Sequence, residues 1–218
     1  RSRFELEEQE MLRGMTFDGY LTNNGQIVYD GSWNLLRTVA MVPDEVRALV
    51  DYCDERSLPL WLVSEQRSRF NYHFNDRVPV VMAEIHTEIP ERCDLHTMLQ
   101  EPVVKAVMFL TAQEVREGPL SFMPHARSTQ WFIHGQDIIP AEGGKLPAMR
   151  FIAEANGWTP DELMAFGDSE NDNEMLCYAG TGVAMGNALE ETKAASDYVT
   201  DDCDDEGVAH ALAHFALI

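Results

Sequence analysis

LMAFGDSENDNEML, residues Leu163–Leu176, is the most informative segment of the chain. Its apolar start, Leu163–Phe166, predicts a short strand that ends at Gly167-Asp168. Asn173–Ala179 then predicts a helix that Gly180 stops. The sequence therefore places a cluster of acidic and amide side chains between the end of a strand and the start of a helix.

This junction is a candidate site. In open parallel sheets, ligands bind beyond the carboxyl ends of the strands. Asp168, Asn171 and Asp172 are therefore expected to face a ligand. Carboxylates at a strand end suit Mg²⁺, which takes one or two carboxylates, keeps waters and shares the phosphate oxygens of a substrate.

Two other interpretations of the junction need weighing. The alternating acids resemble a calcium loop, but an EF-hand needs Gly at its sixth position and Glu at its twelfth. Asn173 and Ala179 stand there, which excludes that interpretation. A solvated acidic turn that only begins a helix stays open on composition alone.

The last third of the chain alternates helices with short apolar strands. Lys145–Asn156, Glu190–Ala195 and residues 206–215 are further predicted helices, and Thr159-Pro160-Asp161-Glu162 is a capping box with Pro at the first helical position. Val183–Met185 and Tyr198–Thr200 are further predicted strands. This alternation predicts a parallel sheet with crossover helices.

The middle third lacks that regular alternation, so we expect a second, inserted domain there. The predicted strands are two around the Asn23-Asn24-Gly25 turn within Gly19–Asp30, then Leu58–Val63, Pro102–Leu110 and Thr129–Ile133. Asp44–Ser57 is a predicted helix, and Ser68–Asp76 is predicted to be helix or loop. We also predict a helix at the start of the chain. Ser2 and Glu5 form a capping box there, and an apolar side is made by Phe4, Met11, Leu12 and Met15.

Taken together, GDSENDNEML, TGVAMGNA, a following Lys, ASDYVT, a C-terminal helix and FDGYLTNNGQIVYD resemble the Cof-type (subclass IIB) branch of the haloacid dehalogenase superfamily. The resemblance implies an α/β fold. Its Rossmann-like core with a parallel sheet would comprise residues 1–37 and 138–218, and an inserted α+β cap domain would comprise residues 38–137. It also implies a hydrolase: a Mg²⁺-dependent phosphatase of small phosphorylated metabolites, sugar phosphates among them.

The same resemblance assigns roles to single residues. Asp168 matches the acidic metal ligand, and Ser169 beside it is a candidate for the metal shell through its backbone or a water. Asn171 matches the amide that contacts phosphate, and Asp172 the acid that orients its neighbours. Lys145 matches the lysine near the phosphate and the nucleophile, although taken alone it would be a surface lysine at a helix start.

Weaker candidates surround this set. Asn24 and Asn187 are candidate substrate contacts, each with a plain structural turn as the alternative. His210 and His214 are expected to be ordinary helix residues. Ordinary surface groups, with substrate specificity as the alternative, are expected at Glu65, Arg67, Arg69, Trp131 and His134.

One departure from the family is severe. The family's nucleophile and acid/base stand in a D-x-D-G-[ST] motif on the first strand. The sequence has a single D-x-D, Asp202-Cys203-Asp204, which follows no apolar strand. We therefore expect a family member without its first strand, first helix and second strand, which cannot perform the reaction as written. The rival hypotheses are a phosphotransferase or phosphomutase on the same fold, and a degenerate binding or regulatory protein.

Composition restricts the partners. The formal charge of −21 argues against nucleic acid and anionic membranes as partners, and is compatible with metal cations and small metabolites. The apolar stretches are far shorter than the roughly 18 residues that span a bilayer. Four scattered cysteines without a C-x-x-C pair predict reduced thiols and a cytoplasmic protein. The oligomeric state cannot be predicted from the sequence.

Overall fold

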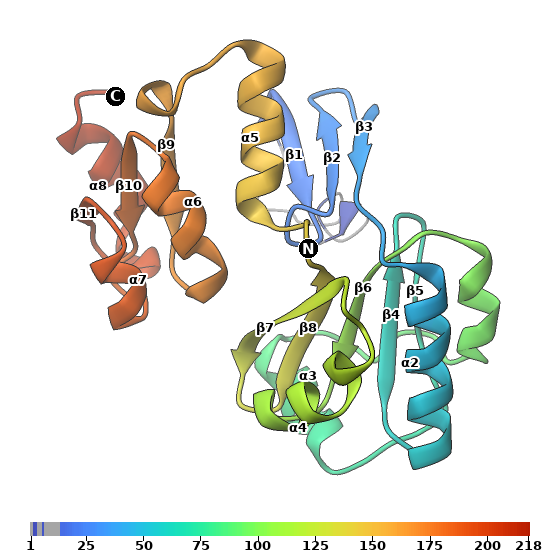
Figure 1. The fold of residues 1–218 in the computed structure, drawn as a ribbon. Helices are drawn as coiled ribbons and strands as arrows, with labels where there is room; N and C mark the ends of the chain where they lie inside the picture. Colours follow the sequence, from blue (N-terminus) through green and yellow to red (C-terminus); the bar gives the residue numbers. More distant parts are fainter. Residues whose placement is uncertain (1, 4–5, 7–13) are drawn as a thin grey trace. The chain divides into compact units, whose positions relative to one another are not determined.

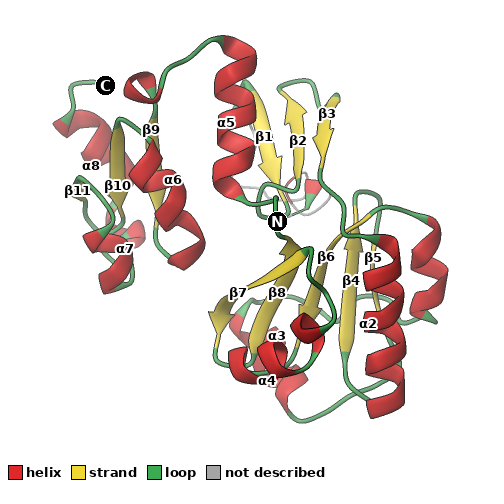
Figure 2. Ribbon diagram, in the orientation of Figure 1, coloured by secondary structure: helices red, strands yellow, loops and turns green. Residues whose placement is uncertain are grey.

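The computed structural model describes residues 2, 3, 6 and 14–218, and the chain forms two compact units, Arg1–Gly144 and Lys145–Ile218. The helix predicted at the start of the chain lies outside the described residues. Figure 1 traces both units in sequence colours, and Figure 2 shows their helices and strands. Each unit is described by itself.

The first unit begins with a small antiparallel sheet in the order β1-β2-β3. Its strands are β1 (Gly19–Thr22), β2 (Ile27–Asp30) and β3 (Leu35–Thr38). The turn between β1 and β2 has positive φ at Asn23, Asn24 and Gly25. Asn and Gly tolerate this region of backbone space best, so the predicted hairpin is confirmed for a physical reason.

A five-stranded antiparallel sheet follows, in the order β5-β4-β6-β8-β7. Its strands are β4 (Leu60–Ser64), β5 (Ser68–Phe70), β6 (Val103–Met108), β7 (Ala126–Phe132) and β8 (Gly135–Pro140). From residue 14 onward, the α-helices of this unit are α2 (Pro43–Arg56), α3 (Arg77–Glu84) and α4 (Ala112–Glu117). Short 3₁₀ turns lie at Leu95–Gln100 and Pro119–Ser121.

Both faces of the five-stranded sheet are covered by apolar side chains. Leu60 and Leu62 of β4 pack with Val46 and Leu49 of α2 on one face. On the other face, Trp61 and Val63 pack with α3 and with β2. A strand buried on both faces reads as a continuous apolar run, which is why LPLWLV was recognisable in the sequence.

Two parts of this sheet were not predicted. Ser68–Phe70 is a strand, β5, rather than part of a helix or loop, because Phe70 is fully buried and its segment pairs with β4. Strand β8 had no sequence prediction, and it joins β6 to β7.

The second unit holds the predicted parallel sheet, in the order β11-β10-β9. Its strands are β9 (Met164–Gly167), β10 (Thr181–Ala184) and β11 (Tyr198–Val199). Its helices are α5 (Lys145–Asn156), α6 (Asn173–Tyr178), α7 (Glu190–Ala194) and α8 (Gly207–His214). Short 3₁₀ turns lie at Pro160–Glu162, Glu170–Asp172 and Cys203–Asp205.

Every strand and helix predicted for this unit is present within one or two residues. Figure 2 shows the helices and strands alternating along it. The fold class is therefore α/β, as predicted. In the described part of the chain, no helix is long and apolar enough to span a membrane.

Candidate active site

Asp172 is the centre of a hydrogen-bonded cluster in the second unit. Its Oδ1 accepts from Lys145 Nζ at 2.6 Å. Its Oδ2 accepts from the backbone N–H groups of Asp168 at 3.2 Å and of Ser169 at 3.3 Å. Asp172 is only 2% exposed, so these donors replace the water that a buried carboxylate has lost.

The end of β9 positions this carboxylate. After Gly167 the chain enters the 3₁₀ turn Glu170–Asp172, and Asp172 N donates to Ser169 O at 2.9 Å. This turn places Asp172 back near the carboxyl end of β9. The sequence produces this locally, since the five residues between β9 and α6, Asp168–Asp172, are all polar.

Lys145 is the first residue of α5 and follows Gly144, whose φ of 132° favours glycine. Its ammonium group donates to Asp172 and, at 3.2 Å, to Asn171 Oδ1. An ammonium group has three N–H donors, so one is left for a ligand. The Lys145 side chain is 30% exposed, and a ligand can therefore reach it.

Asn171 and Ser169 complete the cluster. Asn171 Oδ1 accepts from Lys145 and also from Ser169 Oγ at 2.9 Å. Asn171 is half-buried, and no described residue accepts from its Nδ2. The cluster thus presents an ammonium N–H and an amide NH₂ as donors, a pair suited to an anionic oxygen.

Asp168 is the last sequence-predicted member. Its backbone carbonyl accepts from Leu189 N at 3.1 Å, which joins the loop after β9 to the loop after β10. Its side chain is exposed, and within the described residues its carboxylate accepts no hydrogen bond. It therefore presents a hard oxygen ligand at the carboxyl end of a parallel strand.

This donor set fits Mg²⁺. Asp168 belongs to no group of three potential protein ligands among the residues that the structure describes. Mg²⁺ needs no such group, because it is held by one or two carboxylates and keeps several waters. Soft cysteine and histidine ligands would indicate zinc or another transition metal, and none takes part in the hydrogen bonds of this cluster.

Comparison with known proteins identifies the family. The sequence model of the haloacid dehalogenase-like hydrolases matches residues 3–212, nearly the whole chain. The chain belongs to this family.

Individual relatives agree with this assignment. The chain is 25% identical over 217 residues to the 5-amino-6-(5-phospho-D-ribitylamino)uracil phosphatase YcsE of Bacillus subtilis, covering 96% of this chain and 77% of YcsE. It superposes on the HAD subclass IIB sugar phosphatase BT4131 with a TM-score of 0.81 and 30% identity, over 93% of this chain and 77% of that one. A protein of Geobacillus kaustophilus gives a TM-score of 0.85 and 31% identity, over 100% and 83%.

The remaining candidates of this haloacid dehalogenase-like chain lie outside the cluster. Asn187 is exposed, and its Oδ1 accepts from Cys203 N at 3.2 Å, a bond between two loops. Asn24 belongs to the first unit, where its Nδ2 donates to Asp137 Oδ2 at 2.8 Å. Substrate contacts by either residue remain predictions.

Other side chains have ordinary partners. Arg67 pairs with Glu101, and Arg69 pairs with Glu91 at 3.0 Å. His210 Nδ1 lies 2.7 Å from Asp201 Oδ2. Glu65 is hydrogen-bonded to Tyr29, Trp131 to Asp137, and His214 stacks on Tyr198. The partner of Asn187 is the Cys203 loop, as described above.

The sequence did not reveal a buried charge network in the first unit. Asp137 is 4% exposed, and its carboxylate accepts from Asn24, from Lys105 Nζ at 3.2 Å and from Trp131 Nε1 at 3.0 Å. These residues come from four separate segments, so no spacing in the sequence indicates that they meet.

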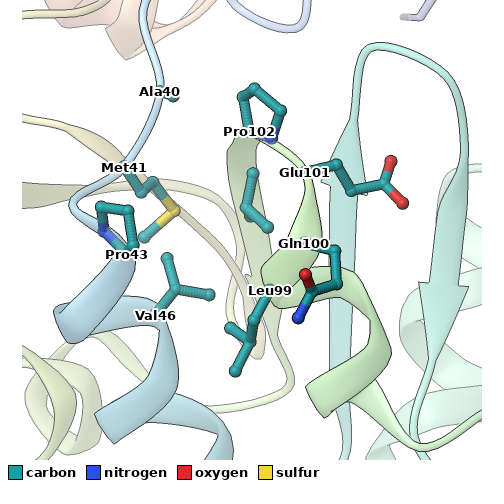
Figure 3. Close-up of a pocket in the computed structure, with 9 residues that line it drawn as sticks. Ala40, Met41, Pro43, Val46, Leu99, Gln100, Glu101 and Pro102 are labelled. Carbon is teal, nitrogen blue, oxygen red and sulfur yellow. The ribbon is translucent and has the colours of Figure 1, made fainter.

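The first unit also contains a cavity of about 370 Å³, which Figure 3 shows. It lies between the segment that enters α2, with Met41 and Val46, and the segment that enters β6, with Leu99 and Val103. Glu101 is the one charged residue in its lining, and in Figure 3 its carboxylate points away from the cavity. Ser64 Oγ donates to that carboxylate at 2.6 Å. The cavity therefore offers apolar surface and no acid or base.

Proposed function

We propose that this protein is a Mg²⁺-dependent phosphatase of small phosphorylated metabolites, with sugar and other polyol phosphates as the substrate class. The observation that carries the proposal is the cluster of Lys145, Asn171 and Asp172 beside the exposed carboxylate of Asp168. The activities for which two relatives, BT4131 and YcsE, are named support the substrate class, since both concern phosphate esters of polyhydroxylated groups.

The proposed roles follow from the available donors and acceptors. Lys145 and Asn171 bind the phosphate through the ammonium N–H and the amide NH₂ that the cluster leaves unused. Asp172 fixes the Lys145 ammonium, and its own charge is satisfied by three donors. Asp168 would hold Mg²⁺, which when bound neutralises charge on the phosphate oxygens.

We also propose how the chain divides into a core and a cap domain, and in which cellular compartment the protein works. The core would comprise residues 1–37 and 138–218, and a cap of residues 38–137 would select the leaving group. All four cysteines are free thiols, which favours a reducing compartment such as the cytoplasm.

A second candidate function is a binding or regulatory protein without catalysis. The 218 residues contain no D-x-D-G-[ST] motif, and the two candidates differ in whether the protein carries that motif. The intact mass of the protein isolated from its host separates the two. A mass several kDa above 24.6 kDa, with D-x-D-G-[ST] in the additional residues, supports the phosphatase. A mass of 24.6 kDa with phosphate binding but no turnover supports the binding protein.

The metal role is tested on the isolated full-length protein with Asp168→Asn. We expect hydrolysis of phosphate monoesters to require Mg²⁺, and Asp168→Asn to weaken Mg²⁺ binding, measured by calorimetry, at least about tenfold. Asp161→Asn is the matched control, because Asp161 is an exposed aspartate of the same unit. Unchanged Mg²⁺ affinity in Asp168→Asn would contradict the assignment, and transfer of phosphate to added sugar would show a phosphotransferase.

A further inference from the structure

We propose that Ser169 is a positioning residue that turns the amide of Asn171 so that its NH₂ group, rather than its carbonyl, faces the bound phosphate. This inference rests on the proposed function. It gives the Ser169 hydroxyl a task that is separate from the predicted contribution of Ser169 to the metal shell through its backbone or a water.

The chemistry of Lys145 fixes which end of the Asn171 amide points inward. An ammonium group is a donor only, so the Asn171 atom 3.2 Å from Lys145 Nζ must be the acceptor, Oδ1. Ser169 Oγ lies 2.9 Å from the same atom and must therefore donate its hydrogen there. Both inward bonds are made to the carbonyl end, and the NH₂ end is left to face a ligand.

Ser169 is the better placed of the two donors. Lys145 divides its ammonium between Asp172 at 2.6 Å and Asn171 at the longer distance of 3.2 Å. Ser169 stands two residues from Asn171, and its own backbone N–H is held by Asp172. When a phosphate attracts the flexible lysine, the serine bond keeps the amide in place.

The inverted amide would bind phosphate poorly. It would place NH₂ against the Lys145 ammonium, donor against donor, and would turn a carbonyl oxygen toward an anion. The serine hydroxyl disfavours this inverted orientation, because it donates its only hydrogen to the amide oxygen. A hydroxyl used in this way is a positioning group for the phosphate, and Mg²⁺ affinity should not depend on it.

The experiment measures phosphate and Mg²⁺ binding separately on the full-length protein. Ser169→Ala removes the donor, and Ser169→Thr keeps a hydroxyl at a position whose extended backbone, φ −140°, accepts a branched side chain. Ser196→Ala is the matched control, because Ser196 Oγ also donates one local hydrogen bond, to Lys193 O at 2.8 Å.

We expect Ser169→Ala to weaken inorganic phosphate binding, followed by ³¹P NMR, about fivefold, the worth of one hydrogen bond. Ser169→Thr should restore the affinity, and Ser196→Ala should leave it unchanged. Because Ser169 acts through Asn171, Ser169→Ala should add nothing in an Asn171→Ala background. Mg²⁺ affinity, measured by calorimetry, should be the same in wild type and Ser169→Ala.

A second readout needs no ligand. The side-chain NH₂ signals of Asn171 in ¹H–¹⁵N spectra should move in Ser169→Ala and return in Ser169→Thr. If these signals do not move, the inference is wrong. It is also wrong if Ser169→Ala weakens Mg²⁺ binding and spares phosphate binding, because Ser169 then belongs to the metal shell. If the wild type binds no phosphate, the proposed function fails, and the Asn171 signals still decide the geometry.

Discussion

Gly167 and Asp172 lie so close that a side chain at residue 167 would collide with the acid at the centre of the cluster. A Cβ on Gly167 would stand 2.4 Å from Asp172 Cβ and 2.7 Å from its Cγ. The last residue of β9 must therefore be glycine for the Asp172 carboxylate to reach Lys145 and the backbone N–H groups of the turn.

Gly167→Ala is expected to displace Asp172 and disorganise the cluster. We expect a loss of stability of about 2 kcal/mol from overpacking, and about tenfold weaker phosphate binding because Lys145 loses its fixed partner. Urea denaturation and a ³¹P titration measure the two effects.

The control is Gly157→Ala, which separates strain from damage to the site. Gly157 has φ 72° with no atom within 4 Å of an added Cβ, so alanine there costs about 1 kcal/mol of backbone strain. Phosphate binding should be unchanged in this variant. Equal phosphate affinities in Gly167→Ala and wild type would show that Asp172 does not need its observed position.

Lys145→Met tests the charge that the cluster presents to an anion. It leaves the carboxylate of Asp172 with two backbone donors and no cation. Because the lysine side chain is 30% exposed, we expect a modest destabilisation of about 1–2 kcal/mol. Phosphate affinity should fall about 10- to 100-fold, as for the loss of a hydrogen bond to a charged group.

Lys193→Met is the matched control for that substitution. Lys193 also ion-pairs with an acid of the same unit, Glu190, at 3.1 Å, but that acid is exposed. Its removal should cost no more than about 0.5 kcal/mol and leave phosphate binding intact. If both lysine variants lower phosphate affinity alike, the effect is general charge and the site assignment fails.

The second unit could be predicted from the sequence because its signals are local. Strand β9, the turn after it and α6 follow one another within residues 164–178, and glycine stops mark their ends. In the first unit, β8 was missed because Gln136 and Asp137 are polar yet buried. A strand with such residues is recognised only through its partners, and those are distant in sequence.

The candidate site also combines features that could be predicted from the sequence with features that could not. The identities of Lys145, Asp168, Asn171 and Asp172 could be predicted from a family resemblance. The direction of the Ser169 hydrogen bond could not, because a hydroxyl can serve a metal or a neighbouring amide equally well in a sequence. The requirement for glycine at residue 167 also became evident only from the distance to Asp172.

Asp137→Asn tests the buried charge network of the first unit. The substitution leaves the Lys105 ammonium, whose side chain is 16% exposed, without its counter-charge. We expect a loss of about 3 kcal/mol in urea denaturation, and recovery of much of it in the double variant Lys105→Met, Asp137→Asn.

Glu55→Gln is the control for that network, since the Glu55–Arg56 pair is exposed and should contribute almost nothing. A stability of Asp137→Asn equal to that of wild type would mean that the Lys105–Asp137 pair contributes no net free energy to the fold.

Glu114 predicts a pH dependence of stability in the first unit. Its carboxylate accepts from both Nη atoms of Arg77, at 2.7 and 3.1 Å, and from Thr111, which lowers its pKa to about 2. Because the pKa of Glu114 is lower in the folded protein than in the unfolded one, the ionised side chain stabilises the fold at pH values above the unfolded-state pKa near 4.5. This stabilisation is lost as the pH falls from about 5 to about 2. Because Glu114 is 43% exposed, we expect at most about 1 kcal/mol at neutral pH. The difference in unfolding free energy between wild type and Glu114→Gln, measured in urea from pH 7 to pH 2.5, should therefore shrink steadily below pH 5, and a difference independent of pH would show that ionisation of Glu114 does not contribute to stability.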